Sequence, residues 1–322
     1  MGDSKHTLRR RTFRKSFSPS DIIYERKSVN VMKKLHEPVL LQEVLAWLKP
    51  ARGESYFDMT AGYGGHAGKV LEMTRNYKDA VLNDRDENAI SALRSQFVET
   101  GAEILQGDFY GSALSMVESG KKFDMVMADF GVSSPQLDNA ERGFSYASDA
   151  PLDMRMDVSQ RLNAGIIVNE WNERRIAEVL EKYGELGAGQ AKGVARAIAS
   201  ARPVRTTGEL VRVVQAKMGR AWKKPEAKVF QAIRIAVNDE LGQIENVLPL
   251  IPRLLNPGGR VAIISFHSLE DRLVKRYFAE VSAYGEESEL KVLTKKPVVA
   301  EQVEIDNNPR ARSAKLRVAM RR

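Results

Sequence analysis

The sequence predicts an α/β fold in which a doubly wound parallel sheet is interrupted by a helical insertion. Short apolar runs alternate with helical patterns between residues 55 and 128, which is typical of such a sheet. The alternation then stops, and the pattern from 160 to about 250 is helical. A buried apolar run returns at 261–266, and residues 314–320 alternate apolar and basic side chains as a last strand would. The simplest architecture is one sheet domain with helices inserted into it.

Local patterns place the individual elements. Apolar runs bounded by turn residues predict strands at 55–57, 80–83, 103–105, 123–128 and 261–266. Amphipathic spacing predicts helices at 39–48, 67–74 and 87–98. A capping box of Ser268 and Asp271 predicts one more helix after the last buried run. Residues 130–157 are expected to be irregular. In the helical stretch, an apolar stripe indicates packing against a core, and it consists of Phe230, Ile233, Val237, Leu241, Ile244 and Leu248.

The composition excludes several classes of protein. The chain of 322 residues contains no cysteine, which rules out disulfides, cysteine-ligated zinc, iron–sulfur clusters and thiol nucleophiles. Its 43% hydrophobic and 29% charged residues are ordinary for a globular protein. No apolar run approaches the ~18 residues of a membrane span. We therefore expect a cytoplasmic protein with a sizeable core and no membrane partner.

Positive charge gathers at both ends of the chain. Residues 1–34 hold ten Lys and Arg against three Asp and Glu, residues 307–322 hold six against none, and the part between has a net charge of −5. Basic ends are common in proteins that bind polyanions, because each phosphate contacted releases counterions. A solvated tail without a partner explains the charge equally well. Residues 1–34 are expected to form a basic disordered arm, with an organelle transit peptide as the alternative.

A glycine-rich turn after the first strand has the spacing of a nucleotide-binding motif. Gly62 and Gly64 precede Ala67 at the start of a helix, and Asp84 lies twenty residues beyond Gly64. Glycines let the backbone approach a ligand, the helix N-terminus faces that ligand, and the acid suits ribose hydroxyls. Asp58 ends the first strand, where it would repel the pyrophosphate of NAD but suits the ammonium and sulfonium of S-adenosylmethionine. The methyl donor is therefore the favoured cofactor.

Further side chains are expected to converge on this turn. Asp58, Asp84 and Asp129 each end a predicted strand, and Phe109 follows another. Because the C-terminal ends of parallel strands line the ligand crevice of a doubly wound sheet, these residues should meet, with the ring of Phe109 placed to stack on adenine. Asp is also common at strand ends for local reasons, so a chance arrangement is the alternative.

Other common sites lack support in the sequence. The four histidines show no H-x-x-x-H spacing, so no metal site is expected, although His66 and His267 fall at crevice positions. The chain has no G-x-S-x-G motif and no P-loop, which argues against hydrolase and NTPase activities.

Longer motifs run through the chain from about residue 36 to 320. They are HEPVLL at 36–41, GGH at 64–66, DFGVSSPQLD at 129–138, RGFS at 142–145, PLDMRMD at 151–157, FQAIRIAVNDEL at 230–241, ISFHSLEDR at 264–272 and NPRARS at 308–313. In these motifs the chain resembles the bacterial small-subunit ribosomal RNA cytosine-N4 methyltransferases, the RsmH or MraW family. One departure is Phe130, where the family usually has Leu.

The resemblance implies a Rossmann-like class I S-adenosylmethionine methyltransferase sheet with an inserted helical domain. It implies methylation of the exocyclic N4 amine of a decoding-centre cytidine, with small-subunit ribosomal RNA, within the small ribosomal subunit, as the partner. The division it implies is a methyltransferase domain at 35–139 and 250–322 and a helical substrate-recognition domain at 140–249. Carried over by motif, the cofactor contacts are Gly64, Gly65, His66, Asp84, Phe109, Asp129 and Gln136.

Methylation of a cytosine amine sets demands on the remaining residues. Its nitrogen lone pair is delocalised into the ring, so alignment and acceptors for the amine's protons should help the reaction. We expect Asp129 or neighbouring backbone carbonyls to be that acceptor, and the alternative is that Asp129 serves only the cofactor. The base must leave its stack to reach the donor. Candidates for binding the RNA are Arg142, Phe144 and Arg155. Equally, Arg–Asp pairs such as Arg155 with Asp153 or Asp157 could only fold this loop.

Two other functions stay open at this point. A non-catalytic RNA-binding ribosome assembly factor could use the same scaffold, although the intact glycine turn and strand-end acids argue against lost cofactor binding. An NAD-dependent oxidoreductase is disfavoured by Asp58.

Overall fold

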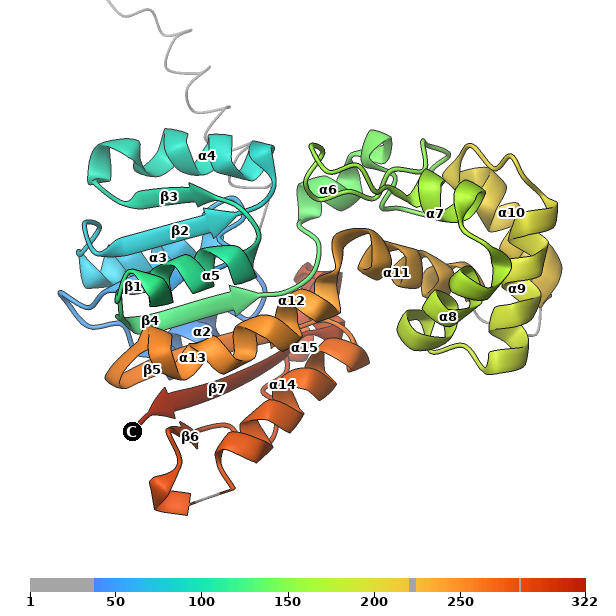
Figure 1. Ribbon diagram of the computed structural model, residues 1–322. Coiled ribbons are helices and arrows are strands. Elements are labelled where there is room, and N and C mark those ends of the chain that lie inside the picture. The colour runs from blue at the N-terminus through green and yellow to red at the C-terminus, as the bar shows by residue number, and fades with distance from the viewer. Residues whose placement is uncertain (1–37, 220–223, 284) are drawn as a thin grey trace, which may run out of the picture. The chain divides into compact units, whose positions relative to one another are not determined.

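One sheet organises the computed structural model, which describes residues 38–219, 224–283 and 285–322; the expected arm at 1–34 lies outside them. In this part of the chain, seven strands follow the order β3-β2-β1-β4-β5-β7-β6 (Figure 1). β1 to β5 are parallel to one another, and β7 is antiparallel to its two neighbours, β5 and β6. This confirms the predicted Rossmann-like fold class. The strands are β1 (Tyr56–Asp58), β2 (Ala80–Asp84), β3 (Glu103–Gln106), β4 (Phe123–Asp129), β5 (Leu255–Ser265), β6 (Leu290–Val292) and β7 (Lys315–Arg321).

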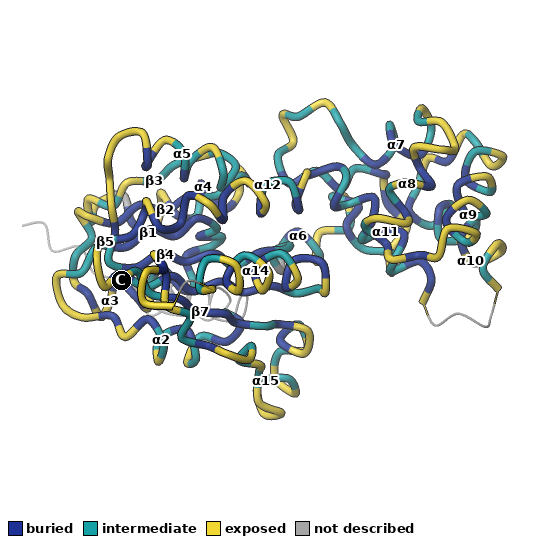
Figure 2. The backbone as a smooth tube through the Cα atoms, turned by 60° about the horizontal axis from the view of Figure 1, so that its bottom comes forward, coloured by how far each residue is buried: buried dark blue, intermediate teal, exposed yellow. Residues whose placement is uncertain are grey.

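Helices cover both faces of the sheet. Tyr56 and Phe57 point to opposite faces, as neighbours in a strand must, and each joins a different apolar cluster. The cluster of Tyr56 includes α2 (Leu41–Leu48), α3 (Gly65–Thr74) and α4 (Glu87–Phe97). The cluster of Phe57 includes α5 (Phe109–Glu118), α12 (Glu240–Val247), α13 (Ile251–Leu254) and α14 (Ser268–Val281). Burial on both faces, seen as dark blue strands in Figure 2, explains the continuous apolar runs of the sequence.

Between β4 and β5, the described residues from 164 to 247 are mostly helical, as predicted for the stretch from 160 to about 250. Five helices of this stretch surround a core of their own, which includes Ile167, Leu180 and Ile198. These helices are α7 (Ala164–Glu170), α8 (Glu173–Gly184), α9 (Ala188–Ser200), α10 (Thr207–Met218) and α11 (Pro225–Asn238). The apolar stripe at 230–248 is buried throughout, but it divides between two cores. The helix breaks at Asp239, whose φ is 49°, so Leu241 and the residues after it pack on α5 instead.

The start of α14 lies one residue from the position that the sequence predicted. His267, not Ser268, is the N-cap, and its side chain accepts a hydrogen bond from the backbone N–H of Glu270. Glu270 reaches back to the N–H groups of Phe266 and His267, because glutamate is long enough to close a capping box. Asp271 instead accepts a 2.7 Å hydrogen bond from Nε of Arg317. The helix is present where it was predicted, but its N-cap is a different residue.

Smaller differences concern short elements. α6 (Ser134–Asp138) lies in a stretch expected to be irregular, and α15 (Gln302–Asn307) and β6 had no prediction. β5 begins at Leu255, earlier than expected, and its pairing with β4 shifts register between Phe123 and Met125. Among the described helices, none is both long and apolar enough to cross a membrane.

Gly143 is required by the loop that follows β4. Its φ is 67°, and an added Cβ would lie 2.3 Å from the carbonyl oxygen of Pro151 and 2.9 Å from the backbone nitrogen of Asp153. We expect Gly143→Ala to lower the free energy of unfolding by about 3 kcal/mol or more, because backbone strain and overlap with backbone atoms add. Denaturant unfolding measures this. Gly120→Ala is the matched control: its φ is 74°, nothing lies within 4 Å, and a loss of only about 1 kcal/mol is expected. Equal losses in the two variants would contradict the prediction.

Candidate active site

Three carboxylates meet at the C-terminal edge of the sheet. Asp58, Asp84 and Asp129 are the last residues of β1, β2 and β4, and β1 lies between the other two strands. Burial raises the pKa of Asp58 to about 7 and that of Asp84 to about 6, and it raises the pKa of Asp129 well above its usual range. The charge of Asp84 adds to the rise at Asp58, and the charge of Asp58 adds to the rise at Asp129. The structure therefore brings together the acids that the sequence predicted to converge.

Asp58 and Asp129 differ in how they are satisfied. Asp58 accepts hydrogen bonds from Oη of Tyr56 at 2.8 Å and from the backbone N–H of Thr60 at 3.2 Å. Oδ2 of Asp129 lies 3.7 Å from Nδ1 of His66, whereas Oδ1 is buried and has no hydrogen-bond partner among the residues that the structure describes. A buried carboxylate oxygen without a partner is rare, and it indicates an acceptor for a ligand's cation or proton.

The glycine turn connects these acids to α3 and α4. The backbone N–H of Gly62 donates to Oδ2 of Asp84 at 2.9 Å. Gly64 has φ of 80°, and a Cβ there would lie 2.7 Å from Oε1 of Gln96 and 2.9 Å from the ring of Phe97. At Gly65, a Cβ would lie 2.6 Å from the ring of Pro38. Only glycine lets the turn lie this close to its neighbours, and α3 begins at Gly65 with its N-terminus at the same edge.

Two aromatic rings, those of Phe109 and Phe130, pack together next to the end of β4. Phe109 is the first residue of α5, directly after β3, and its ring centroid lies 5.3 Å from that of Phe130. Phe130 follows Asp129 in the chain, so Phe109 contacts the segment that leaves the end of β4. The departure from the family's usual Leu therefore supplies Phe109 with an aromatic neighbour.

Both polar atoms of the Gln136 side chain form hydrogen bonds within the protein. Its Oε1 accepts from the backbone N–H of Ser133 at 3.0 Å, and its Nε2 donates to Oδ2 of Asp86 at 2.8 Å. Oδ2 of Asp86 also accepts from Nη1 of Arg142 at 3.0 Å, and Asp86 is buried. Sequence analysis did not single out Asp86. The available signal was its position just ahead of α4, where Asp is a common cap.

The candidates for RNA binding lie in a well-bonded loop. Arg155 donates from Nε and Nη2 to Asp153, both at 2.8 Å, and from Nη1 to two backbone carbonyls. Phe144 is buried, and Arg142 donates to Asp86 and to the carbonyls of residues 155 and 156. These contacts agree with the alternative given above, in which Arg–Asp pairs only fold this loop. Contact of Arg142, Phe144 or Arg155 with RNA stays a prediction.

A second group of titratable side chains lies beyond β5. Ligand atoms of Glu240, His267 and Glu270 lie within 4.8 Å of one another, a spacing that sequence analysis did not find because the residues belong to different elements. Glu240 accepts two hydrogen bonds from Arg234, at 2.9 and 2.8 Å. Glu270 lies 3.0 Å from Nε2 of His267. Arg234 therefore accounts for the carboxylate of Glu240, and the backbone N–H groups of Phe266 and His267 bind one oxygen of Glu270.

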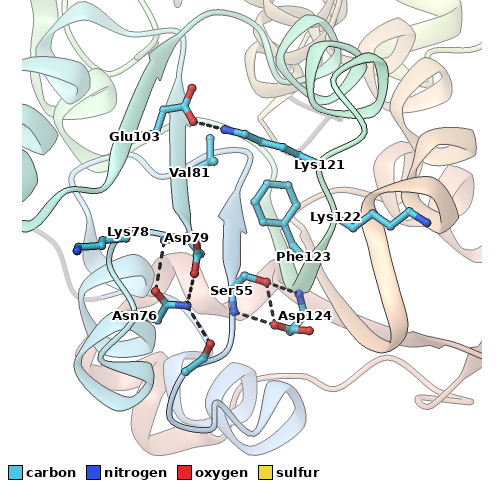
Figure 3. A pocket seen from close by; sticks show the side chains of 11 residues that line it. Ser55, Asn76, Lys78, Asp79, Val81, Glu103, Lys121, Lys122, Phe123 and Asp124 are labelled. Atoms are coloured by element: carbon cyan, nitrogen blue, oxygen red, sulfur yellow. Dashed lines mark hydrogen bonds and ion pairs between the residues drawn. The ribbon is translucent and has the colours of Figure 1, made fainter.

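A cavity of about 310 Å³ lies at the opposite edge of the sheet (Figure 3). Its lining comes from the beginnings of the strands and from the turns before them. The polar side chains there pair with one another: Lys121 with Glu103, Ser55 with Asp124, and Asn76 with Asp79. No residue predicted for the site lines it.

A Rossmann-like sheet with a glycine turn after β1 and acids at the ends of β1, β2 and β4 is the arrangement of a methyltransferase of the α/β class. It belongs to the MraW methylase family, whose model matches residues 33–322. This confirms the resemblance seen in the sequence.

Curated relatives match over most of the chain. A protein from Acidobacterium capsulatum is 43% identical over 295 residues, covering 88% of this chain and 97% of the relative. One from Trichormus variabilis is 44% identical over 289 residues, with 88% and 91% covered, and one from Heliobacterium modesticaldum is 42% identical over 307, with 88% and 97% covered. Each is named ribosomal RNA small subunit methyltransferase H.

Proposed function

We propose that this protein uses S-adenosylmethionine to methylate the exocyclic N4 amine of a cytidine in small-subunit ribosomal RNA. The relatives' names support the RNA substrate. The observation that carries the chemistry is Oδ1 of Asp129, a buried acceptor without a partner at the end of β4. An amine that loses a proton on methylation needs such an acceptor.

The residues at the sheet edge fit the proposed cofactor. Among the described residues, the carboxylates of Asp58 and Asp84 have no cationic partner of their own. They therefore suit a ligand that carries an ammonium and a sulfonium, and they disfavour the pyrophosphate of NAD. The sulfonium-activated methyl group is the chemistry that this cofactor supplies. The side chains and backbone that would hold it are those of Gly64, Gly65, His66, Asp84, Phe109 and Asp129, with Gln136 acting through Asp86.

The chain's own part in the reaction is to exclude water, orient the amine and receive its proton. The rings of Phe109 and Phe130 pack together next to the end of β4, the strand whose last residue is Asp129. Burial makes Asp129 a better proton acceptor than an exposed aspartate, because its pKa is raised. We propose that Asp129 holds a proton of the amine as its nitrogen becomes tetrahedral.

The helical segment is the proposed site of substrate recognition. We assign the inserted domain to residues 140–249, of which the part from Glu240 on packs against α5 of the sheet, and the methyltransferase domain to 35–139 and 250–322, with the small ribosomal subunit as the partner. The separate core of α7–α11 supports a segment that could fold around an RNA without disturbing the sheet. A cytoplasmic location goes with this substrate.

Nucleoside mass spectrometry tests the proposal. The protein is incubated with S-adenosylmethionine and small ribosomal subunits that lack cytosine-N4 methylation, and the RNA is then digested. We expect new N4-methylcytidine, and none when the donor is replaced by S-adenosylhomocysteine. A different methylated nucleoside would overturn the assigned acceptor. Binding of the donor without any methyl transfer would favour the assembly factor.

A further inference from the structure

A closed ring of hydrogen bonds connects the cofactor edge to the helical segment. Arg142 donates from Nη1 to Asp86 at 3.0 Å and from Nη2 to the carbonyls of Arg155 and Met156, at 2.9 and 3.1 Å. The backbone N–H of Met156 donates to Oδ1 of Asn238 at 2.8 Å, and the carbonyl of Asn238 accepts from Nη1 of Arg85 at 3.0 Å. Arg85 and Asp86 are neighbours in the chain, so the path closes. We call these residues, 85, 86, 142, 156 and 238, the Asp86 ring.

The ring is attached directly to Asp84. The backbone N–H of Asp86 donates to Oδ1 of Asp84 at 2.8 Å, and Oδ2 of Asp84 accepts from the glycine turn at Gly62. Both carboxylate oxygens of Asp84 are therefore oriented by backbone that the ring or the turn holds. At its other end the ring contains Asn238, the last residue of α11, which is 1% exposed. A movement of α11 and a movement of Asp84 cannot be independent while the ring is intact.

The composition of the ring indicates more than a contribution to stability. A buried ion pair is weak support for a fold, because desolvation offsets the attraction between the charges. Within the described part of the chain, the ring also leaves two buried donors without acceptors, Nε of Arg85 and Nε of Arg142. A network selected for stability alone would satisfy them. Its geometry is better explained by a requirement to hold residues 85–86, the loop at 142–156 and the end of α11 in one fixed arrangement.

We propose that Asp86 is a positioning residue that couples the cofactor site to the helical segment, without touching the cofactor itself. This inference rests on the proposed function. Asp86 fixes Asp84 and Gln136 on one side and, through Arg142, the loop at 153–157 and the end of α11 on the other. By linkage, a ligand that orders Asp84 must tighten the ring, and the ordered ring must favour that ligand by the same factor.

Hydrogen exchange and ligand binding test the coupling. Two backbone amides report on the ring: that of Met156, bonded to Asn238, and that of Met154, which donates to the carbonyl of Arg142. In the unaltered chain, saturating S-adenosylhomocysteine should slow exchange in the peptide 153–157 by about fivefold or more. In Asp86→Asn, the affinity for this ligand should fall by about tenfold, and the protection should be lost even when the ligand is saturating.

A second variant serves if Asp86→Asn fails to fold. Arg142→Lys keeps the charge beside Asp86 but cannot also span two carbonyls, so it opens the ring at one point. It should lose the ligand-induced protection and bind S-adenosylhomocysteine about threefold more weakly or worse. Arg310→Lys is the matched control, since Arg310 makes an exposed ion pair with Asp138 outside the ring. Its affinity and protection should equal those of the unaltered chain.

The outcomes separate this inference from the proposed function. Ligand binding without any protection at 153–157 would overturn the coupling and leave the methyltransferase assignment standing. The same holds if Arg142→Lys retains full protection. Failure of the unaltered chain to bind S-adenosylhomocysteine would overturn the proposed function, and the coupling with it.

Discussion

Replacing Asp129 with Asn is expected to abolish methyl transfer while making the protein without ligand more stable at pH 8. The change removes the charge and keeps the shape. Methyl transfer should fall by at least about 100-fold, the usual loss when a group that stabilises developing charge is removed. If Asp129 serves the amine, the affinity for S-adenosylhomocysteine should stay close to that of the unaltered chain. If it serves the cofactor's ammonium, that affinity should fall with the rate.

The gain in stability follows from the raised pKa of Asp129. In the unfolded chain the carboxyl ionises near its ordinary pKa of about 3.9, whereas burial and the charges of Asp58 and Glu270 oppose ionisation in the folded chain. The group therefore favours the folded state at low pH and disfavours it progressively as the pH rises. Asparagine does not titrate, so its advantage should be small at pH 4.5 and should reach at least about 3 °C in thermal midpoint at pH 8.

Asp79→Asn is the matched control for this experiment. Asp79 is exposed at the opposite edge of the sheet and accepts a hydrogen bond from Nδ2 of Asn76. Its replacement should change the midpoint by less than about 1 °C at either pH and leave methyl transfer intact. Unchanged methyl transfer in Asp129→Asn would remove Asp129 from the mechanism. A lower midpoint at pH 8 would show that its carboxylate is stabilised by contacts other than those described.

The sheet edge was predictable because its geometry follows from local patterns. Apolar runs identify the strands, their parallel pairing fixes which ends meet, and Asp58, Asp84 and Asp129 stand at those ends. The glycine turn is equally local. These features follow from the spacing of apolar residues along the sequence and from the topology of a doubly wound sheet.

The Asp86 ring was not predictable from the same patterns. Asp86 and Gln136 are fifty residues apart, and Asp86 and Arg142 fifty-six, and no periodicity records which side chains meet across such a distance. The break at Asp239 is similar: the apolar spacing continues through it, and only packing on two different cores decides that the helix ends there. At α14, two overlapping capping boxes were possible, and the longer reach of Glu270 decided between them. Tertiary contacts settled the first two, and the length of the Glu270 side chain settled the third.

Cofactor binding is expected to release protons and to strengthen as the pH rises from 6 to 8. Without a ligand, Asp58 has a pKa of about 7 and Asp84 of about 6, so both are partly protonated at pH 6. A bound ammonium favours the ionised carboxylates, so binding expels their protons. By linkage, full ionisation of Asp58 contributes about tenfold in affinity over this pH range, and that of Asp84 about twofold. Calorimetric titration with S-adenosylhomocysteine in two buffers of different ionisation enthalpy measures the protons directly.

Asp58→Asn assigns the larger part of this dependence. The variant keeps an acceptor for Tyr56 or Thr60 but has no carboxyl at position 58 to release a proton. Because only the contribution of Asp84 remains, its affinity should vary only about twofold between pH 6 and 8. The same raised pKa means that the unaltered chain without ligand loses stability as the pH rises from about 4 through 7, and that the ligand restores it. Binding that weakens as the pH rises would require the three acids to meet the ligand as proton donors. The site would then not be one that recognises a cation, and the methyl donor would have to be replaced by a ligand of the opposite charge.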